Sequence, residues 1–273
     1  MRFERTDRRR AQKGEKMTRF IGIVSGKGGV GKTTVTVNLG SVLAQKFGKD
    51  VVIVDCNITT SHLGLFIGMY YCPVTLNSVI KGEAHIKDAM YEHASGVKVI
   101  PASLTLEDLK GVDVSKMKRA IKKLFGEVDI VILDAAPGLG REASATLESA
   151  DEILFVATPY VPSISDIIKT KLIVDDIGSK VLGLVLNMVT NDRHELKKEE
   201  VEGLVGMPVV ATIPYEKKIL KSLSNKVPVT MMYPDSKVAK EFEKLALFVL
   251  GEEVEEGGFW KKIKRFFTLG SSE

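Results

Sequence analysis

Short apolar runs alternate with longer helix-like segments from Met17 to about Gly251. The runs are rich in β-branched residues and read RFIGIVS, VVIVD, VKVIP, VDIVILD, EILFVAT, KVLGLVLN and MPVVATIP. Strands that are apolar almost throughout are buried on both faces, which is typical of a parallel sheet between two helix layers. The pattern therefore predicts an α/β fold, a mostly parallel sheet flanked by helices on both faces, in one domain over residues 17–250.

The two ends of the chain depart from this pattern. Residues 1–16 hold seven Arg/Lys against three Asp/Glu and show no apolar period, which predicts a disordered basic arm. Met17 directly precedes the first strand and is therefore a second candidate start. Residues 251–258 predict an acidic flexible linker, and residues 259–269 are aromatic and basic.

The distribution of charge along the chain indicates which kinds of binding partner are compatible with the sequence. The formal net charge of +4 equals the excess carried by residues 1–16, so the rest of the chain is neutral overall. A neutral body argues against a broad nucleic-acid surface. No apolar run approaches the ~18 residues that span a bilayer, and no secretory signal is present. The two cysteines lie outside any CxxC motif, which favours a reducing cytoplasm. The four histidines show no metal-ligand spacing.

The stretch SGKGGVGKTT predicts a phosphate-binding loop. Residues 26–33 fit G-x-x-x-x-G-K-[ST], follow a strand and open a helix predicted over 31–46. Backbone N–H groups of such a loop converge on phosphate oxygens at a helix N-terminus. We expect Lys32 to pair with the β- and γ-phosphates of ATP and the Thr33 hydroxyl to ligate Mg²⁺. The expected nucleotide-binding residues here are Gly26, Lys27, Gly28, Gly29, Val30, Gly31, Lys32, Thr33 and Thr34.

A second lysine, Lys27, lies five residues before Lys32. The stretch KGGVGKTT resembles the deviant Walker A motif of the MinD/ParA ATPases, most of all the MinD type, and the resemblance covers about residues 17–250. In that family the extra lysine reaches across a dimer to the partner's phosphates. The resemblance thus implies an ATP-dependent homodimer in which Lys27 acts in trans. The alternative, that Lys27 only adds charge to its own site, stays open.

The same resemblance implies further site residues. Residues 54–68 match the family's first switch segment and residues 131–143 its second. Asp134 is then expected to hold Mg²⁺ through water, and Asp55 to contact metal-bound water. Asn187, together with Pro214 and Tyr215, stands where the family holds adenine. An asparagine in an ordinary strand-end turn is the alternative for Asn187.

One position departs from the family. The usual Asp-x-Asp reads Asp55-Cys56-Asn57, and the uncharged Asn57 cannot accept a proton from the attacking water. Phosphoryl transfer depends mainly on positioning and electrostatics, and an amide orients water in other NTPases. We therefore expect a slow ATPase with Lys27, Lys32, Asp55 and Asn57 as its catalytic set.

The C-terminal segment predicts an amphipathic membrane-targeting helix over residues 259–269. On a helical wheel the apolar residues share roughly 120° of arc and the cations take the other side. Rings would lie among acyl chains and cations at anionic headgroups. Packing on the body or on a partner helix is the alternative. The apolar set is Phe259, Trp260, Ile263, Phe266 and Phe267, and the cationic set is Lys261, Lys262, Lys264 and Arg265.

The leading interpretation is a MinD-like ATPase. Its ATP-driven dimerisation would control reversible attachment to the inner face of the cell membrane and the positioning of partner proteins, at the division site or in polar machinery. The protein cargo and any activator stay unidentified. The alternatives are a ParA-like DNA segregation ATPase, an iron–sulfur carrier or nitrogenase-reductase relative, which needs paired cysteines, and a scaffold that binds ATP with little turnover.

Overall fold

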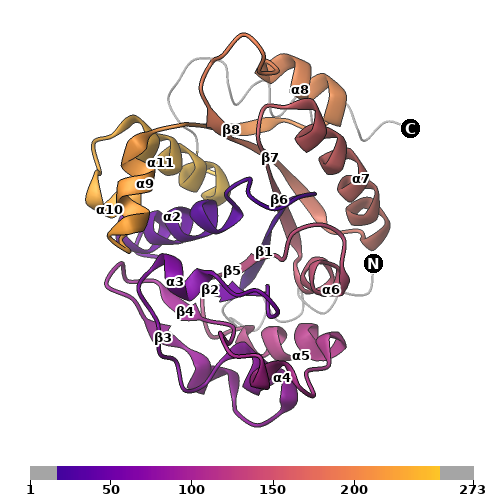
Figure 1. Ribbon diagram of the computed structural model, residues 1–273, viewed down its shortest axis with the longest axis vertical. Helices are drawn as coiled ribbons and strands as arrows, with labels where there is room; N and C mark the ends of the chain where they lie inside the picture. Colours follow the sequence, from indigo (N-terminus) through magenta and orange to yellow (C-terminus); the bar gives the residue numbers. More distant parts are fainter. Residues whose placement is uncertain (1–16, 253–273) are drawn as a thin grey trace.

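A single eight-stranded sheet forms the centre of the protein, whose computed structural model describes residues 17–252 (Figure 1). The strand order is β3-β4-β2-β5-β1-β6-β7-β8. Every neighbouring pair is parallel except β3 and β4, at one edge. The mostly parallel sheet expected from the sequence is thus confirmed. The strands are β1 (Arg19–Val24), β2 (Val51–Asp55), β3 (Tyr91–Glu92), β4 (Lys98–Ile100), β5 (Ile130–Asp134), β6 (Glu152–Ala157), β7 (Lys180–Val189) and β8 (Val209–Pro214).

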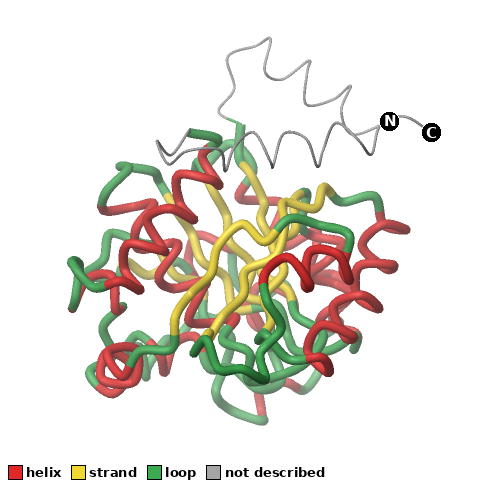
Figure 2. The backbone as a smooth tube through the Cα atoms, turned by 90° about the horizontal axis from the view of Figure 1, so that it is seen from above, coloured by secondary structure: helices red, strands yellow, loops and turns green. Residues whose placement is uncertain are grey.

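Helices cover both faces of the sheet, and the strands run between them when the molecule is seen from above (Figure 2). One face carries α4 (Leu76–Lys81), α5 (Met117–Ile121), α6 (Arg141–Ser149), α7 (Val161–Ile177) and α8 (Lys198–Val205). The other carries α2 (Lys32–Gln45), α3 (Leu63–Phe66), α9 (Lys217–Ser224), α10 (Val229–Met232) and α11 (Lys237–Leu250). Short 3₁₀ turns are η1 (Ile86–Ala89), η2 (Glu107–Leu109), η3 (Val114–Lys116) and η4 (Lys122–Leu124).

The two helix layers explain why the strands are apolar at successive positions. Along β1, Phe20 and Val24 enter the core that includes α4 to α8, whereas Ile21 and Ile23 enter the core that includes α2 and α11. All four are at most 1% exposed. Burial on both faces removes the polar alternation of a half-exposed strand, because successive side chains point to opposite faces.

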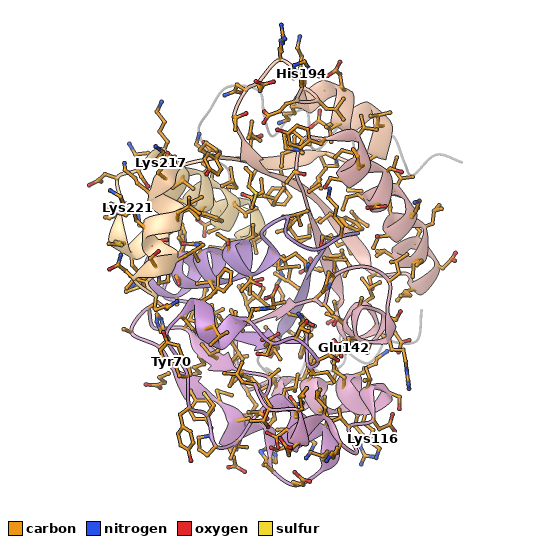
Figure 3. All side chains as sticks on the ribbon, viewed as in Figure 1. Tyr70, Lys116, Glu142, His194, Lys217 and Lys221 are labelled. Carbon is orange, nitrogen blue, oxygen red and sulfur yellow. The ribbon has the colours of Figure 1, made fainter. Side chains whose placement is uncertain are left out.

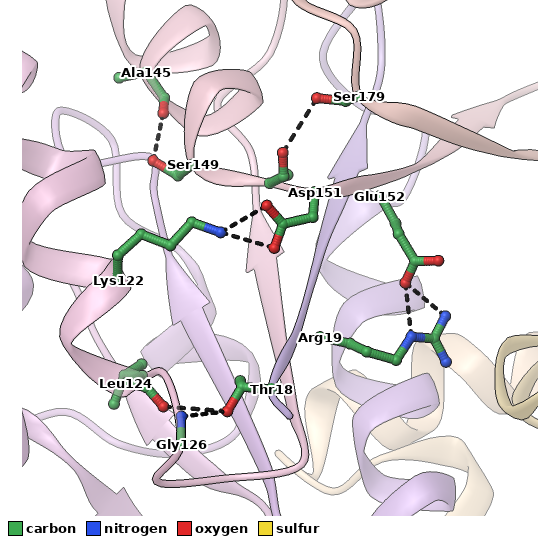
Figure 4. A network of polar contacts seen from close by, with 11 residues as sticks. Thr18, Arg19, Lys122, Leu124, Gly126, Ala145, Ser149, Asp151, Glu152 and Ser179 are labelled. Atoms are coloured by element: carbon green, nitrogen blue, oxygen red, sulfur yellow. Dashed lines mark hydrogen bonds and ion pairs between the residues drawn. The ribbon is translucent and has the colours of Figure 1, made fainter. Parts of the chain in front are cut away.

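A polar network connects the segments at the amino ends of the central strands β1 and β6 (Figure 4). The Arg19 guanidinium donates to Glu152 Oε2 at 2.7 Å and 2.6 Å, through Nε and Nη2. Lys122, just after α5, binds both carboxylate oxygens of Asp151 at 2.8 Å. The Thr18 hydroxyl donates to the Val128 carbonyl at 2.6 Å. These contacts hold the amino ends of the strands in place.

Several sequence expectations fall outside this description. The basic arm at 1–16, most of the linker at 251–258 and the membrane-targeting segment at 259–269 lie outside the described residues. Among the helices of residues 17–252, none combines the length and apolar character needed to cross a membrane.

Gly183 marks an irregularity in the pairing of β6 with β7. The register shifts between Ile153 and Leu154, and Gly183 has φ 148°. A methyl carbon at this position would lie 2.5 Å from Val210 Cγ1 and 2.8 Å from the Pro208 carbonyl oxygen. Both the backbone conformation and the close approach of β8 therefore require glycine.

Gly183→Ala is expected to lower the free energy of unfolding by about 2–4 kcal/mol, because strain and overpacking act together. Gly203→Ala is the control, because Gly203 lies on exposed α8 with nothing near the added methyl. The control should raise stability by ~0.5–1 kcal/mol through helix propensity. Urea unfolding followed by circular dichroism measures both, and equal effects from the two substitutions would refute the requirement for glycine at position 183.

Candidate functional site

The phosphate-binding loop lies between the carboxyl end of β1 and the first turn of α2. Gly29 and Gly31 have φ 79° and 92°, a region that side chains with a Cβ rarely adopt. Gly26 packs against α7, since a methyl carbon there would lie 2.3 Å from Asp166 Cβ. The loop conformation is thus fixed by glycines and by its neighbour helix.

The two lysines of the loop differ in their surroundings. Lys32 is 7% exposed, and its ammonium donates to the Ser25 hydroxyl at 2.9 Å. Burial lowers the pKa of Lys32, and the charge of Asp134 opposes that change. Lys27 is half-buried, and within residues 17–252 no ion pair involves its ammonium. The ammonium of Lys32 therefore binds within its own loop, whereas the ammonium of Lys27 makes no ion pair within residues 17–252.

Two predicted carboxylates meet beside this loop. Asp55 ends β2 and Asp134 ends β5, and the two residues are register partners in adjacent strands. The Thr33 hydroxyl donates to Asp134 Oδ2 at 2.6 Å. Thr33, Asp55 and Asp134, the three predicted metal-site residues, therefore lie together. Carboxylate and hydroxyl oxygens with water are ligands that Mg²⁺ accepts, so the donor set fits this ion.

Burial dominates the electrostatics of these carboxylates. It raises the pKa of Asp134 to about 7, the charge of Asp55 adds to the effect, and the bond from Thr33 opposes it. Burial also raises the pKa of Asp55, against hydrogen bonds from Ser61 and the backbone. Two acids taken out of water side by side favour a proton or a cation between them. A divalent cation at this place would relieve both.

The first switch segment, residues 54–68, is organised by short side chains. Asp55 Oδ2 accepts from the Ser61 hydroxyl at 2.7 Å, and Oδ1 accepts from the Asn57 backbone N–H at 3.0 Å. The Asn57 amide donates to the Thr60 carbonyl at 2.7 Å and accepts from the Thr60 hydroxyl at 3.0 Å. Asn57, predicted as a water-orienting group, therefore has both ends of its amide engaged in a local turn.

A contact between the two switch segments was not foreseen from the sequence. The Thr59 hydroxyl donates to a carboxylate oxygen of Glu142, in the first turn of α6. Figure 3 shows Glu142 where α6 begins. Thr59, Thr60 and Ser61 gave no sequence signal beyond loop composition, because each acts through a hydrogen bond that only the folded loop creates.

The predicted adenine positions lie at the ends of β7 and β8. Asn187 is 2% exposed, its amide nitrogen donates to the Val30 carbonyl at 2.8 Å, and its amide oxygen has no hydrogen-bond partner among residues 17–252. Pro214 ends β8, and Tyr215, 50% exposed, donates its backbone N–H to the Val189 carbonyl at 2.9 Å. Asn187 thus braces the phosphate loop and keeps one buried acceptor open for an N–H donor such as an adenine amino group.

The two cysteines differ in burial. Cys56 is fully buried between the two switch residues Asp55 and Asn57, and burial raises the pKa of its thiol well above the ordinary value. Cys72 is half-buried, and burial raises its pKa as well. The chain contains no other cysteine and no CxxC motif.

Comparison with known proteins identifies the class of this site. Residues 16–250 match a family model described as ParA, NUBPL iron-transfer P-loop NTPase. The chain belongs to the ParA family of P-loop NTPases, the group that includes MinD. An uncharacterized ATP-binding protein of Methanocaldococcus jannaschii is 38% identical over 235 residues, which cover 86% of this chain and 89% of that protein.

Solved structures agree with this assignment. The cell division ATPase MinD of Pyrococcus furiosus has a TM-score of 0.83 and 35% identity, covering 86% of this chain and 99% of that one. The septum site-determining protein MinD of Pyrococcus horikoshii, in complex with Mg-ADP, has a TM-score of 0.82 and 33% identity, with 85% and 96% covered. The protein is therefore a P-loop ATPase with ATP and Mg²⁺ as its cofactors.

The raised pKa of Asp134 predicts a pH-dependent stability of the protein without nucleotide or metal. Between pH ~4 and 7 the folded state binds more protons at Asp134 than the unfolded state, so stability falls as pH rises. Asp134→Asn removes this loss, and at pH 8 the variant should exceed the wild type by about 2–4 kcal/mol. The difference should shrink toward pH 5.

Urea unfolding in EDTA at several pH values tests this expectation. Glu148→Gln, an exposed change on α6, is the control and should leave the pH profile unchanged. A wild-type profile parallel to that of Asp134→Asn from pH 5 to 8 would contradict the shifted pKa.

Proposed function

We propose that this ATPase is a MinD-like switch in which ATP drives homodimerisation. The dimer attaches reversibly to the inner face of the cell membrane and positions partner proteins, at the division site or in polar machinery. The observation that carries the proposal is the contrast between the two loop lysines. Lys32 is committed to its own loop through Ser25, whereas the ammonium of Lys27 has no ion pair within residues 17–252.

A second subunit gives Lys27 its partner. The γ-phosphate adds negative charge that a lysine from a facing copy neutralises, and ADP lacks that group. Because a ligand shifts an equilibrium only by its differential affinity for the two states, ATP and ADP then differ in the dimer that they support. Two similar solved structures are named as a cell division ATPase MinD and a septum site-determining protein MinD, and these names support a MinD-like function.

The C-terminal sequence supplies the membrane step of the proposal. Each basic residue near an anionic surface contributes ~1 kcal/mol, and each ring adds less than the ~1.5–3 kcal/mol of full burial. Ordering the segment offsets part of this gain, so one tail binds weakly. Two tails held in a dimer gain ~10²–10⁴ in avidity without any new contact. Dimerisation thereby controls membrane residence.

Co-sedimentation with anionic liposomes tests this function. With ATP and Mg²⁺ the full chain should bind at least ~10-fold more tightly than with ADP. Lys27→Ala should bind ATP but lose this difference, because the trans contact is missing. A chain ending at Gly257 should still dimerise with ATP, as measured by light scattering, but should not sediment.

Lys217→Ala is the matched control, since Lys217 projects from α9 away from the loop (Figure 3). It should behave as the wild type does. Liposome binding that survives truncation at Gly257 would remove the tail from the mechanism. Salt-dependent DNA binding with ATP would favour the ParA-like segregation function instead.

We further propose that hydrolysis is slow. Asn57 carries no charge, and its amide is engaged with Thr60, so no carboxylate at this position polarises the attacking water. Asn57→Asp should raise the turnover number by at least ~10-fold, because a general base typically contributes ~10²–10⁴-fold where proton transfer limits the rate. Phosphate release under saturating Mg-ATP measures this.

Asn225→Asp, an exposed change at the C-terminal cap of α9, is the control and should leave turnover unchanged. Equal or slower turnover in Asn57→Asp would count against the catalytic reason for slow hydrolysis. Undetectable turnover in both proteins would favour a scaffold that binds ATP without using it.

A further inference from the structure

A pocket of about 330 Å³ opens beside the first switch segment. Three separate stretches form it, residues 61–64, 69–75 and 101–108. Its size lies within the range of ligand sites in proteins, ~300–1,000 Å³. It contains none of the phosphate-loop, metal-site or adenine-site residues, so nucleotide binding does not explain it.

The walls of this pocket combine aromatic surface with one carboxylate. Tyr70 and Tyr71 are 61% and 87% exposed, and Leu104 is 49% exposed. Figure 3 shows Tyr70 at the surface of the molecule. Exposed tyrosines concentrate binding energy in interfaces, and their ring faces attract cations. Such walls fit the methylene stem of a long basic side chain.

Asp108 supplies the negative charge. Its Oδ2 accepts from the Ser103 hydroxyl at 2.5 Å and from the Thr105 hydroxyl at 2.9 Å. These bonds hold the pKa of Asp108 below its ordinary value, so the group is ionised near neutral pH. No hydrogen bond to Oδ1 is found within the described part of the chain, so one carboxylate oxygen can accept a ligand's N–H.

The pocket is joined to the metal site through Ser61. The Ser61 hydroxyl donates to Asp55 Oδ2 at 2.7 Å and lies 3.2 Å from the Ala102 carbonyl oxygen. Ser61 and Ala102 both line the pocket. Thr75 lines it as well, is 5% exposed, and has a hydroxyl without a hydrogen-bond partner within residues 17–252. A ligand that fixes residues 101–108 therefore also fixes the hydroxyl that orients Asp55.

We propose that this pocket binds a cationic side chain, an arginine or lysine that a partner protein presents beside an apolar residue, and that its occupancy tightens Mg-nucleotide binding through Ser61. The cation pairs with Asp108, and the apolar neighbour packs on the two tyrosines. This coupling involves the pocket and the nucleotide site but not the C-terminal segment. Failure of the coupling would therefore leave the proposed membrane switch unaffected.

Benzamidinium is a suitable probe, because it is a flat aromatic cation with parallel N–H donors, and benzamide is its neutral match. Ligand-observed NMR on the full chain should give a dissociation constant on the order of 1 mM for benzamidinium. Benzamide should bind at least ~10-fold more weakly, since charge-assisted hydrogen bonds are the stronger ones. Saturating benzamidinium should tighten Mg-ADP binding about fivefold, and Mg-ADP should tighten benzamidinium binding by the same factor.

Asp108→Asn keeps an acceptor for Ser103 but removes the charge, and it should weaken benzamidinium binding about tenfold. Asp113→Asn is the matched control, because Asp113 also accepts from a nearby serine, Ser115, but lies outside the pocket lining. Ser61→Ala should still bind benzamidinium and should lose the coupling to Mg-ADP. A thermal melt of each variant confirms that it is folded.

Each contrary result has a definite meaning. Absence of benzamidinium binding, or equal binding of benzamide, would overturn the cation site. Equal loss in Asp108→Asn and Asp113→Asn would show that binding is not in this pocket. Binding without any change in Mg-ADP affinity would overturn the coupling through Ser61.

Discussion

The burial of charge at the carboxyl ends of β1, β2 and β5 is the constraint on which the rest of this structure depends. Lys32, Asp55 and Asp134 are all less than a tenth exposed, on neighbouring central strands or the helix that follows one. Charged groups out of water are costly unless they are paired or hydrogen-bonded. Here the hydroxyls of Ser25, Thr33 and Ser61 supply those bonds. The core on both faces of the sheet holds these groups in place.

The first switch segment connects this buried charge to the surface. Between Asp55 and Ser61, its side chains make three contacts: Ser61 binds Asp55, Thr60 binds Asn57, and Thr59 binds Glu142 of α6. A change at Asp55 can therefore reach Ser61, the turn formed by Asn57 and Thr60, and α6 through short side chains. After Asp55, the side-chain bonds of Asn57, Thr59 and Ser61 lie outside the strand pairing, so this part of the segment can change without movement of the sheet.

Much of the fold was predictable because burial on both faces leaves strands that are apolar almost throughout. The loop was predictable because residues 26–33 fit the spacing G-x-x-x-x-G-K-[ST]. The antiparallel pair of β3 and β4 was not predicted, since Tyr91–Glu92 is too short to show a period. Strand ends brought Asp55 and Asp134 together, as expected. The engagement of Asn57 by Thr60, and of Asn187 by Val30, could not be read from the sequence, because those bonds depend on loop conformation. Residues 1–16 and 253–273 stay outside this comparison.

The different environments of the two thiols have a consequence for oxidative stress. Peroxide attacks thiolates that are ionised and accessible, and forms sulfenic acid first. Cys56 is fully buried, and the neighbouring carboxylate Asp55 further disfavours its thiolate. Cys72 is partly accessible and lines the pocket that contains Tyr70, Tyr71 and Asp108. Oxidative damage to the thiols of this chain should therefore begin at the pocket, while the sulfur of Cys56, beside Asp55, survives in its reduced form.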